Sequence, residues 1–105
     1  MSKSAKQAPP LIPLFRTGQV VATPGALRTL QAAGVNPMDL LTRHVHGDWG
    51  DLCEEDKRQN EIAVATGQTR VFSSYCIGIG LTEAKVWLIT EWDRSVTTLL
   101  LPSEY

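Results

Sequence analysis

The sequence predicts an α+β fold, in which about three N-terminal helices pack on an antiparallel sheet of three to four strands, formed mainly by a C-terminal meander. Signals that start and stop helices are concentrated between residues 23 and 67, whereas runs rich in β-branched and aromatic residues follow from residue 69 onward. Short turns between these later runs favour antiparallel pairing. With 105 residues, of which 43% are hydrophobic and 20% charged, the chain suffices for one apolar core.

The first thirteen residues, MSKSAKQAPPLIP, are rich in Ser, Lys, Gln and Pro. This composition predicts a flexible leader at residues 1–13, followed by a single α+β domain at residues 14–105. The β-branched residues of FRTGQVVA predict a short strand within Phe15–Ala22, with a bend at Gly18.

Two Pro-containing motifs predict the first two helices. Thr23 and Pro24 place an N-cap oxygen before a proline at the first helical position, and Gly34 can form a left-handed cap, so a helix is expected over Pro24–Ala33. Leu27, Leu30 and Ala33 form its expected inward stripe. The same signal at Asn36-Pro37 predicts a second helix over residues 37–43, with Leu40, Leu41 and then His44 on its inward side.

A capping-box pattern, Asp51 followed by Glu54, predicts a third helix over Leu52–Thr66 that ends at Gly67. Its helical projection turns a charged side toward solvent, formed by Glu54, Lys57, Arg58 and Glu61. Asp56 and Asn60 project inward instead. Because buried polar groups need hydrogen-bond partners, these two side chains are expected to contact loop amides, Arg43 or the histidines.

Three strands are expected after the helices, at residues 69–77, 85–91 and 96–101, with turns at residues 78–80 and 92–95. The terminal hairpin is expected to offer an exposed edge for a homodimer or another partner, with Trp87, Trp92 and Arg94 as interface candidates. Arg94 is also expected to neutralise Glu91 and Asp93 in a salt-bridged hairpin end.

The stretch HVHGDWGD, residues 44–51, holds two imidazoles and two carboxylates. One hypothesis is a metal-dependent hydrolase in which His44, His46 and Asp48 bind a divalent metal. The favoured interpretation is structural: Asp51 caps the third helix, Trp49 fills the core, His44 ends a helix as a favoured imidazolium and His46 lies at the surface. If the loop instead lines a polar pocket, the candidate residues are His44, His46, Asp48, Trp49, Asp56 and Asn60.

Overall charge and motifs restrict the remaining classes. The formal net charge is −1, so nucleic acid is not the favoured partner; that alternative would need Arg16, Arg28, Arg43, Arg58 and Arg70 to meet in space. No apolar run is long enough to span a bilayer, and a cytoplasmic location is expected. The two cysteines form no C-x-x-C pair, and no cofactor motif occurs, so no cofactor is expected.

The segments TPGAL, RHVHGDWGDLCEEDKRQNE and WLITEWDRSVTTLLLPSEY resemble a family of small bacterial proteins of about this size, found on chromosomes and mobile elements. The resemblance covers residues 14–105. Some members carry the label of a type I restriction methylase subunit, but this chain has neither the glycine-rich cofactor loop nor the N/D-P-P-Y/F tetrapeptide of such an enzyme. The function expected from sequence is therefore that of a small non-catalytic binding or accessory protein, with itself or another protein as partner.

Overall fold

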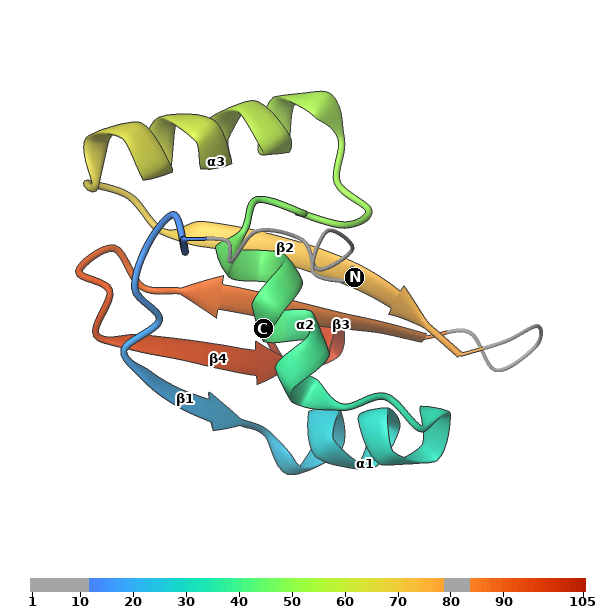
Figure 1. The fold of residues 1–105 in the computed structure, drawn as a ribbon. Coiled ribbons are helices and arrows are strands. Elements are labelled where there is room, and N and C mark those ends of the chain that lie inside the picture. Colours follow the sequence, from blue (N-terminus) through green and yellow to red (C-terminus); the bar gives the residue numbers. More distant parts are fainter. Residues whose placement is uncertain (1–11, 79–83) are drawn as a thin grey trace, which may run out of the picture.

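A computed structural model describes residues 12–78 and 84–105, and it has the predicted α+β class. In chain order the elements are β1 (Gln19–Ala22), α1 (Pro24–Ala33), α2 (Pro37–Val45), α3 (Glu54–Thr66), β2 (Val71–Ile77), β3 (Ala84–Thr90) and β4 (Val96–Leu100), followed by a short 3-10 turn at Pro102–Glu104. The sheet has the strand order β1-β4-β3-β2 (Figure 1). Residues 1–11 of the predicted leader and residues 79–80 of the predicted turn lie outside the described part.

The sheet is mixed, which corrects the prediction of a wholly antiparallel one. β2, β3 and β4 form the expected antiparallel meander, but β1 lies parallel to β4, with Gln19 opposite Val96 and Ala22 opposite Leu99. Because all three helices and two strands separate β1 from β4, no tight turn dictates their relative direction. The terminal hairpin therefore lies inside the sheet, and its β4 strand has a neighbour on both sides.

The caps of α1 and α2 are those that the sequence predicts. The hydroxyl of Thr23 accepts a hydrogen bond from the Ala26 N–H at 3.0 Å, and the Asn36 side chain accepts one from the Met38 N–H at 2.9 Å. Gly34 closes α1 in the left-handed conformation with φ 70°. α2 continues to Val45, two residues beyond its predicted end, so His44 belongs to the helix.

The main core lies between one face of the sheet and helices α1 and α2, and Figure 1 shows α2 crossing that face. Its buried side chains are Ala26, Leu30, Leu40, Leu41, Tyr75, Ile77, Val86, Leu88 and Leu99. Leu27 was expected inward but is exposed, because α1 turns only Ala26 and Leu30 fully into the core. None of the helices in the described ranges is long and apolar enough to cross a bilayer.

α3 lies beside β2 at one edge of the sheet (Figure 1), where Trp49, Ala63 and Val71 form a second buried cluster. The predicted role of Trp49 as a core residue is confirmed. The predicted cap at Asp51 is wrong: α3 begins after Cys53 and has no side-chain cap hydrogen bond. The Asp51 N–H donates instead to the Ser74 carbonyl at 2.6 Å, which holds residue 51 against the sheet and delays the helix.

Candidate functional site

The segment His44–Asp51 contains the last two residues of α2 and most of its connection to α3. It forms an isolated parallel bridge with the edge of β2, between Gly50 and Ser74. Ser74 donates its N–H to the Trp49 carbonyl at 3.1 Å, and its own carbonyl accepts from Asp51. Gly50 makes this approach possible: its φ is 77°, and a Cβ built there would collide with the Ser74 carbonyl. The loop thus covers part of a sheet edge that would otherwise expose unpaired backbone groups.

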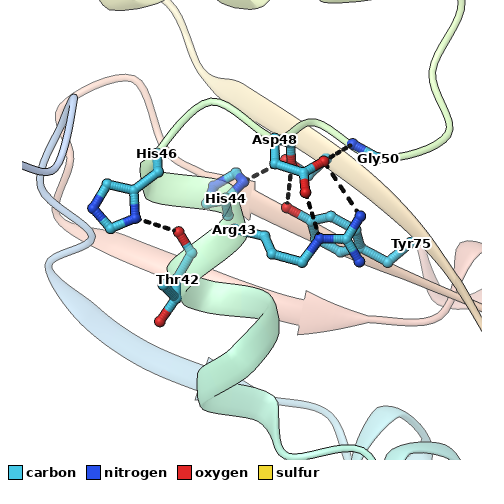
Figure 2. Close-up of polar contacts among 8 residues, drawn as sticks. Thr42, Arg43, His44, His46, Asp48, Gly50 and Tyr75 are labelled. Atoms are coloured by element: carbon cyan, nitrogen blue, oxygen red, sulfur yellow. Dashed lines mark hydrogen bonds and ion pairs between the residues drawn. The ribbon is translucent and has the colours of Figure 1, made fainter. Parts of the chain in front are cut away.

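Asp48 is the polar centre of this loop (Figure 2). Arg43 approaches its carboxylate from α2, with Nε at 2.6 Å from Oδ2 and Nη2 at 3.3 Å from Oδ1, and the Gly50 N–H donates to Oδ1 at 3.3 Å. The hydrogen bond to Arg43 lowers the pKa of Asp48, and the same bond raises the pKa of Arg43. The Tyr75 hydroxyl donates to the Asp48 backbone carbonyl at 2.6 Å. The carboxylate and the backbone carbonyl of Asp48 therefore both hold the loop in place.

Charged residues of α3 line an open groove of about 480 Å³ whose opposite wall is this loop. The lining residues are Gly47, Asp48, Trp49, Gly50, Glu54, Lys57, Arg58 and Glu61. The charged side of α3 is therefore directed toward solvent, as expected, and forms one wall of this groove. The Trp49 indole N–H donates across the groove to the Glu61 carboxylate at 3.4 Å. Of the predicted pocket residues, Asp48 and Trp49 line this groove.

His44 lies fully buried beneath the loop, within a chain of hydroxyl groups. Its Nδ1 is 2.6 Å from the Ser73 hydroxyl, and its Nε2 is 3.0 Å from the Thr90 hydroxyl. Thr90 Oγ1 lies 2.6 Å from Thr97 Oγ1, which in turn donates to the Thr17 carbonyl at 2.8 Å. The side chains of His44, Ser73, Thr90 and Thr97 are inaccessible to solvent.

Counting the protons in this chain determines the tautomer of His44. A carbonyl can only accept, so the single Thr97 hydroxyl proton goes to Thr17, and Thr90 must donate its own proton to Thr97. Thr90 can then only accept from His44, which places the imidazole proton on Nε2 and leaves Nδ1 to accept from Ser73. Burial lowers the pKa of His44 to about 3, so the expected imidazolium is wrong and the ring is neutral.

The three residues of the metal hypothesis do not converge. Figure 2 shows His46 turned away from Asp48, with Nδ1 at 2.7 Å from the Thr42 carbonyl, whereas His44 uses both ring nitrogens inside the core. Asp48 is bound to Arg43. Within the described ranges, no group of three His, Cys, Asp or Glu side chains could hold a metal ion. The arrangement therefore gives no support to a metal-dependent hydrolase.

Asp56 and Asn60, predicted to share an inward polar network, behave differently. Asp56 is exposed, which corrects the prediction. Asn60 is buried, and its side-chain amide makes two hydrogen bonds to the backbone of Phe72. Its Oδ1 accepts from the Phe72 N–H at 3.0 Å, and its Nδ2 donates to the Phe72 carbonyl at 2.6 Å. The amide thereby imitates a neighbouring strand next to the Gly50–Ser74 bridge. The partner is a strand, not the expected loop amide, Arg43 or histidine.

Replacing Asn60 with alanine is expected to destabilise the protein by about 2 kcal/mol, because it removes both side-chain partners of the partly buried Phe72 N–H and carbonyl. Gln59→Ala, on the exposed neighbouring position, serves as the control and should change stability by less than about 0.5 kcal/mol. Urea denaturation gives the free energies, and hydrogen exchange at the Phe72 amide should accelerate only in Asn60→Ala. Equal stability of the two variants would contradict this role.

Arg94 donates to backbone carbonyls of three segments, and among the described residues it forms no ion pair with Glu91 or Asp93, which corrects the predicted salt-bridged hairpin end. Its guanidinium donates to the Ala63 carbonyl at the end of α3 at 2.9 Å, to the Thr69 carbonyl at 2.6 Å and to the Trp92 carbonyl at 3.0 Å. Of the two interface tryptophans, Trp92 is exposed, whereas Trp87 packs edge-to-face on Phe72 and Tyr105.

The five arginines of the nucleic-acid alternative do not share one hollow. Arg16, Arg58 and Arg70 line three separate ones. Arg43 is engaged with Asp48, and Arg70 stacks on the Tyr105 ring. The separate positions of Arg16, Arg58 and Arg70 give no support to a shared basic groove for a phosphate backbone.

A mainly apolar hollow lies elsewhere, between α2, the start of β1 and the chain that precedes it. This groove of about 430 Å³ is lined by Pro13, Phe15, Arg16, Thr17, Gly18, Val20, Met38, Leu41, Thr42 and Val45. It adjoins the outer edge of β1, along which Figure 1 shows no other described element. Sequence reasoning missed this surface as a site, because its apolar character comes from two segments that only the fold brings together.

The fold and these grooves define an α+β domain with a mixed four-stranded sheet; within the described residues, one edge of the sheet is covered and the other is open. Comparisons of the chain with protein-family models, with curated proteins and with solved structures find no match.

Proposed function

We propose that this chain is a small non-catalytic binding protein, and that its partner is a protein that docks at the outer edge of β1 and in the adjoining apolar groove. The observation that carries the proposal is the contrast between the two sheet edges. Asn60 and the Gly50 loop occupy the edge of β2, whereas no described residue pairs with the outer side of β1. Exposed strand edges pair readily with extended segments of other chains.

The side chains around this edge suit a protein partner. Val20 and Met38 are exposed large apolar residues on the rim of the groove, and Leu41 and Val45 extend its apolar surface along α2. Such a surface supplies side-chain pockets beside the backbone hydrogen bonds of an added strand. An accessory role of this kind agrees with the resemblance of the chain to small proteins on mobile elements.

A non-catalytic role is favoured by the buried position of a serine–histidine pair that resembles a nucleophile and its base. Ser73 and His44 are hydrogen-bonded as such a pair would be, but both side chains have no solvent exposure. A substrate would have to open the core between α2 and the sheet to reach them.

Site-specific photo-crosslinking tests the proposal for any polypeptide partner. A photo-reactive amino acid at Val20, which is 43% exposed, is expected to yield a covalent adduct with a polypeptide in cells of the source organism. The same substitution at Ile62, on α3 and 46% exposed, is the matched control and should yield none. Equal adduct formation at both positions, or no adduct at Val20, would refute a docking site at β1.

A further inference from the structure

We infer that the protein docking on β1 is a second copy of this chain, paired antiparallel about a two-fold axis that passes through Val21. This inference rests on the proposed docking site at β1. It assigns the dimer contact to the N-terminal strand, in place of the terminal hairpin that the sequence suggested.

The chemistry of β1 fits self-association. The strand reads Gln19-Val20-Val21-Ala22 and contains no charge and no proline, although these are the residues that usually protect an edge strand. Val20 and Val21 are exposed on opposite faces of the sheet, and Met38, which is 61% exposed, lines the apolar groove together with Val20. A two-fold pairing would cover these apolar side chains on both copies at once.

The backbone of β1 defines the register. The amides of Gln19 and Thr23 donate inward, to the carbonyls of Ser95, which precedes β4, and of Leu99 in β4. The alternate residues Val20 and Ala22 therefore direct their backbone groups outward. With the axis at Val21, Val20 of each copy opposes Ala22 of the other, and every outward N–H and carbonyl of the strand finds a partner. Gln19 then opposes Thr23, so no like charges meet.

The alternative register, with the axis at Val20, is disfavoured by Gly18. It would require Gly18 to pair as an extended residue opposite Ala22. Gly18 instead has φ 63° and lies so close to the Ser95 carbonyl that a Cβ would overlap it. This left-handed residue ends the pairing edge, and the Val21 register therefore forms more hydrogen bonds.

Disulfide trapping tests the contact and its register. In a Cys53→Ser/Cys76→Ser background, Val21→Cys should form a disulfide-linked dimer under mild oxidation, because non-hydrogen-bonded antiparallel pairs have Cα atoms about 4.5 Å apart, within disulfide range. Val20→Cys is the matched control. It opposes Ala22 and should form at least about tenfold less linked dimer, since its own copy lies diagonally beyond disulfide reach.

Sedimentation of the unmodified chain gives the second readout. The wild type is expected to dimerise with concentration, and Val21→Lys, which sets two ammonium groups opposite each other, should raise the dimer dissociation constant at least about tenfold. The thermal unfolding temperature of the monomer, measured below the dissociation constant of the wild-type dimer, should not change. A wild-type monomer at all concentrations, or equal trapping of both cysteine variants, would overturn the inference. If the photo-adduct at Val20 then contains a different protein, the docking site at β1 is retained and only the assignment of a second copy as the partner is wrong. If no adduct forms, both the docking site and the dimer are refuted.

Discussion

Gly50→Ala is expected to destabilise the protein by about 3 kcal/mol or more, and to release the His44–Asp51 loop from the edge of β2. Two independent costs combine at this position. Gly50 has φ 77°, a left-handed conformation that costs an L-residue about 1–2 kcal/mol. The added Cβ would also collide with the Ser74 carbonyl and lie 2.7 Å from the Tyr75 ring, so the bridge must open.

Gly34→Ala is the matched control, because the two costs separate there. Gly34 has a similar φ of 70°, but a Cβ at that position meets nothing within 4 Å. Its substitution should therefore cost only about 1 kcal/mol. Urea denaturation of both variants measures the difference, and the Ser74 and Asp51 amides should exchange faster only in Gly50→Ala. Equal losses of stability would show that the close approach to β2 contributes nothing.

The boundaries of the helices and strands were largely predictable because their signals are local. Thr23-Pro24 and Asn36-Pro37 carry both the cap and the first turn within adjacent residues, and Gly34 and Gly67 end α1 and α3 as expected. Such patterns depend only on backbone hydrogen bonds within one turn. The same locality misled at Asp51, where a nearby strand competes for the residue that the pattern assigns to the cap.

The parallel place of β1 could not be read from the sequence, because its partner strand is separated from it by most of the domain. The contrast between Asp56 and Asn60 has a similar cause. α3 lies beside an edge instead of across a face, so its contact is a narrow stripe around Asn60 and Ala63, and Asp56, one turn away from Asn60, remains in solvent. The sequence-based prediction for α3 assumed the wide buried face of a helix that packs across a sheet, and α3 has no such face.

The polar loop was found from sequence, but the roles of its histidines were not. Spacing from Leu40 and Leu41 correctly placed His44 on the inner side of α2. The hydroxyl groups that form hydrogen bonds with its ring belong to β2 and β3, far along the chain, and no local sequence pattern predicts them. His46 follows by only two residues, yet Figure 2 shows its ring directed away from the ion pair of Arg43 with Asp48.

Acidification is expected to unfold this protein through His44. The unfolded chain takes up a proton at this residue near its ordinary pKa of 6.5, whereas burial holds the folded-state pKa at about 3. Between these values the unfolded state binds more protons, so stability is complete above pH 6.5 and falls by about 1.4 kcal/mol for each unit of pH below it. At about pH 4 the loss is about 3 kcal/mol, a large part of the stability of a small domain.

Burial is the reason that the folded state resists this proton, because it keeps the charged imidazolium away from water. Thr97 and Thr90 already direct their protons along the chain toward Thr17, and Ser73 donates to Nδ1, the unprotonated nitrogen of the ring. In an imidazolium the second ring N–H could donate to the Ser73 hydroxyl oxygen, but no described carboxylate offsets the cost of burying the positive charge.

His44→Gln should therefore lower stability at pH 7 but flatten the dependence between pH 6.5 and 4, while the control His46→Gln retains the wild-type slope. Urea denaturation across this range provides the test, with nitrogen NMR of His44 reporting a neutral Nε2–H ring at about pH 5. A slope unchanged in His44→Gln would assign the acid sensitivity to other groups. The dependence of stability on pH thus measures the difference between the folded-state and unfolded-state pKa of His44, which the burial of its ring between α2 and the sheet produces.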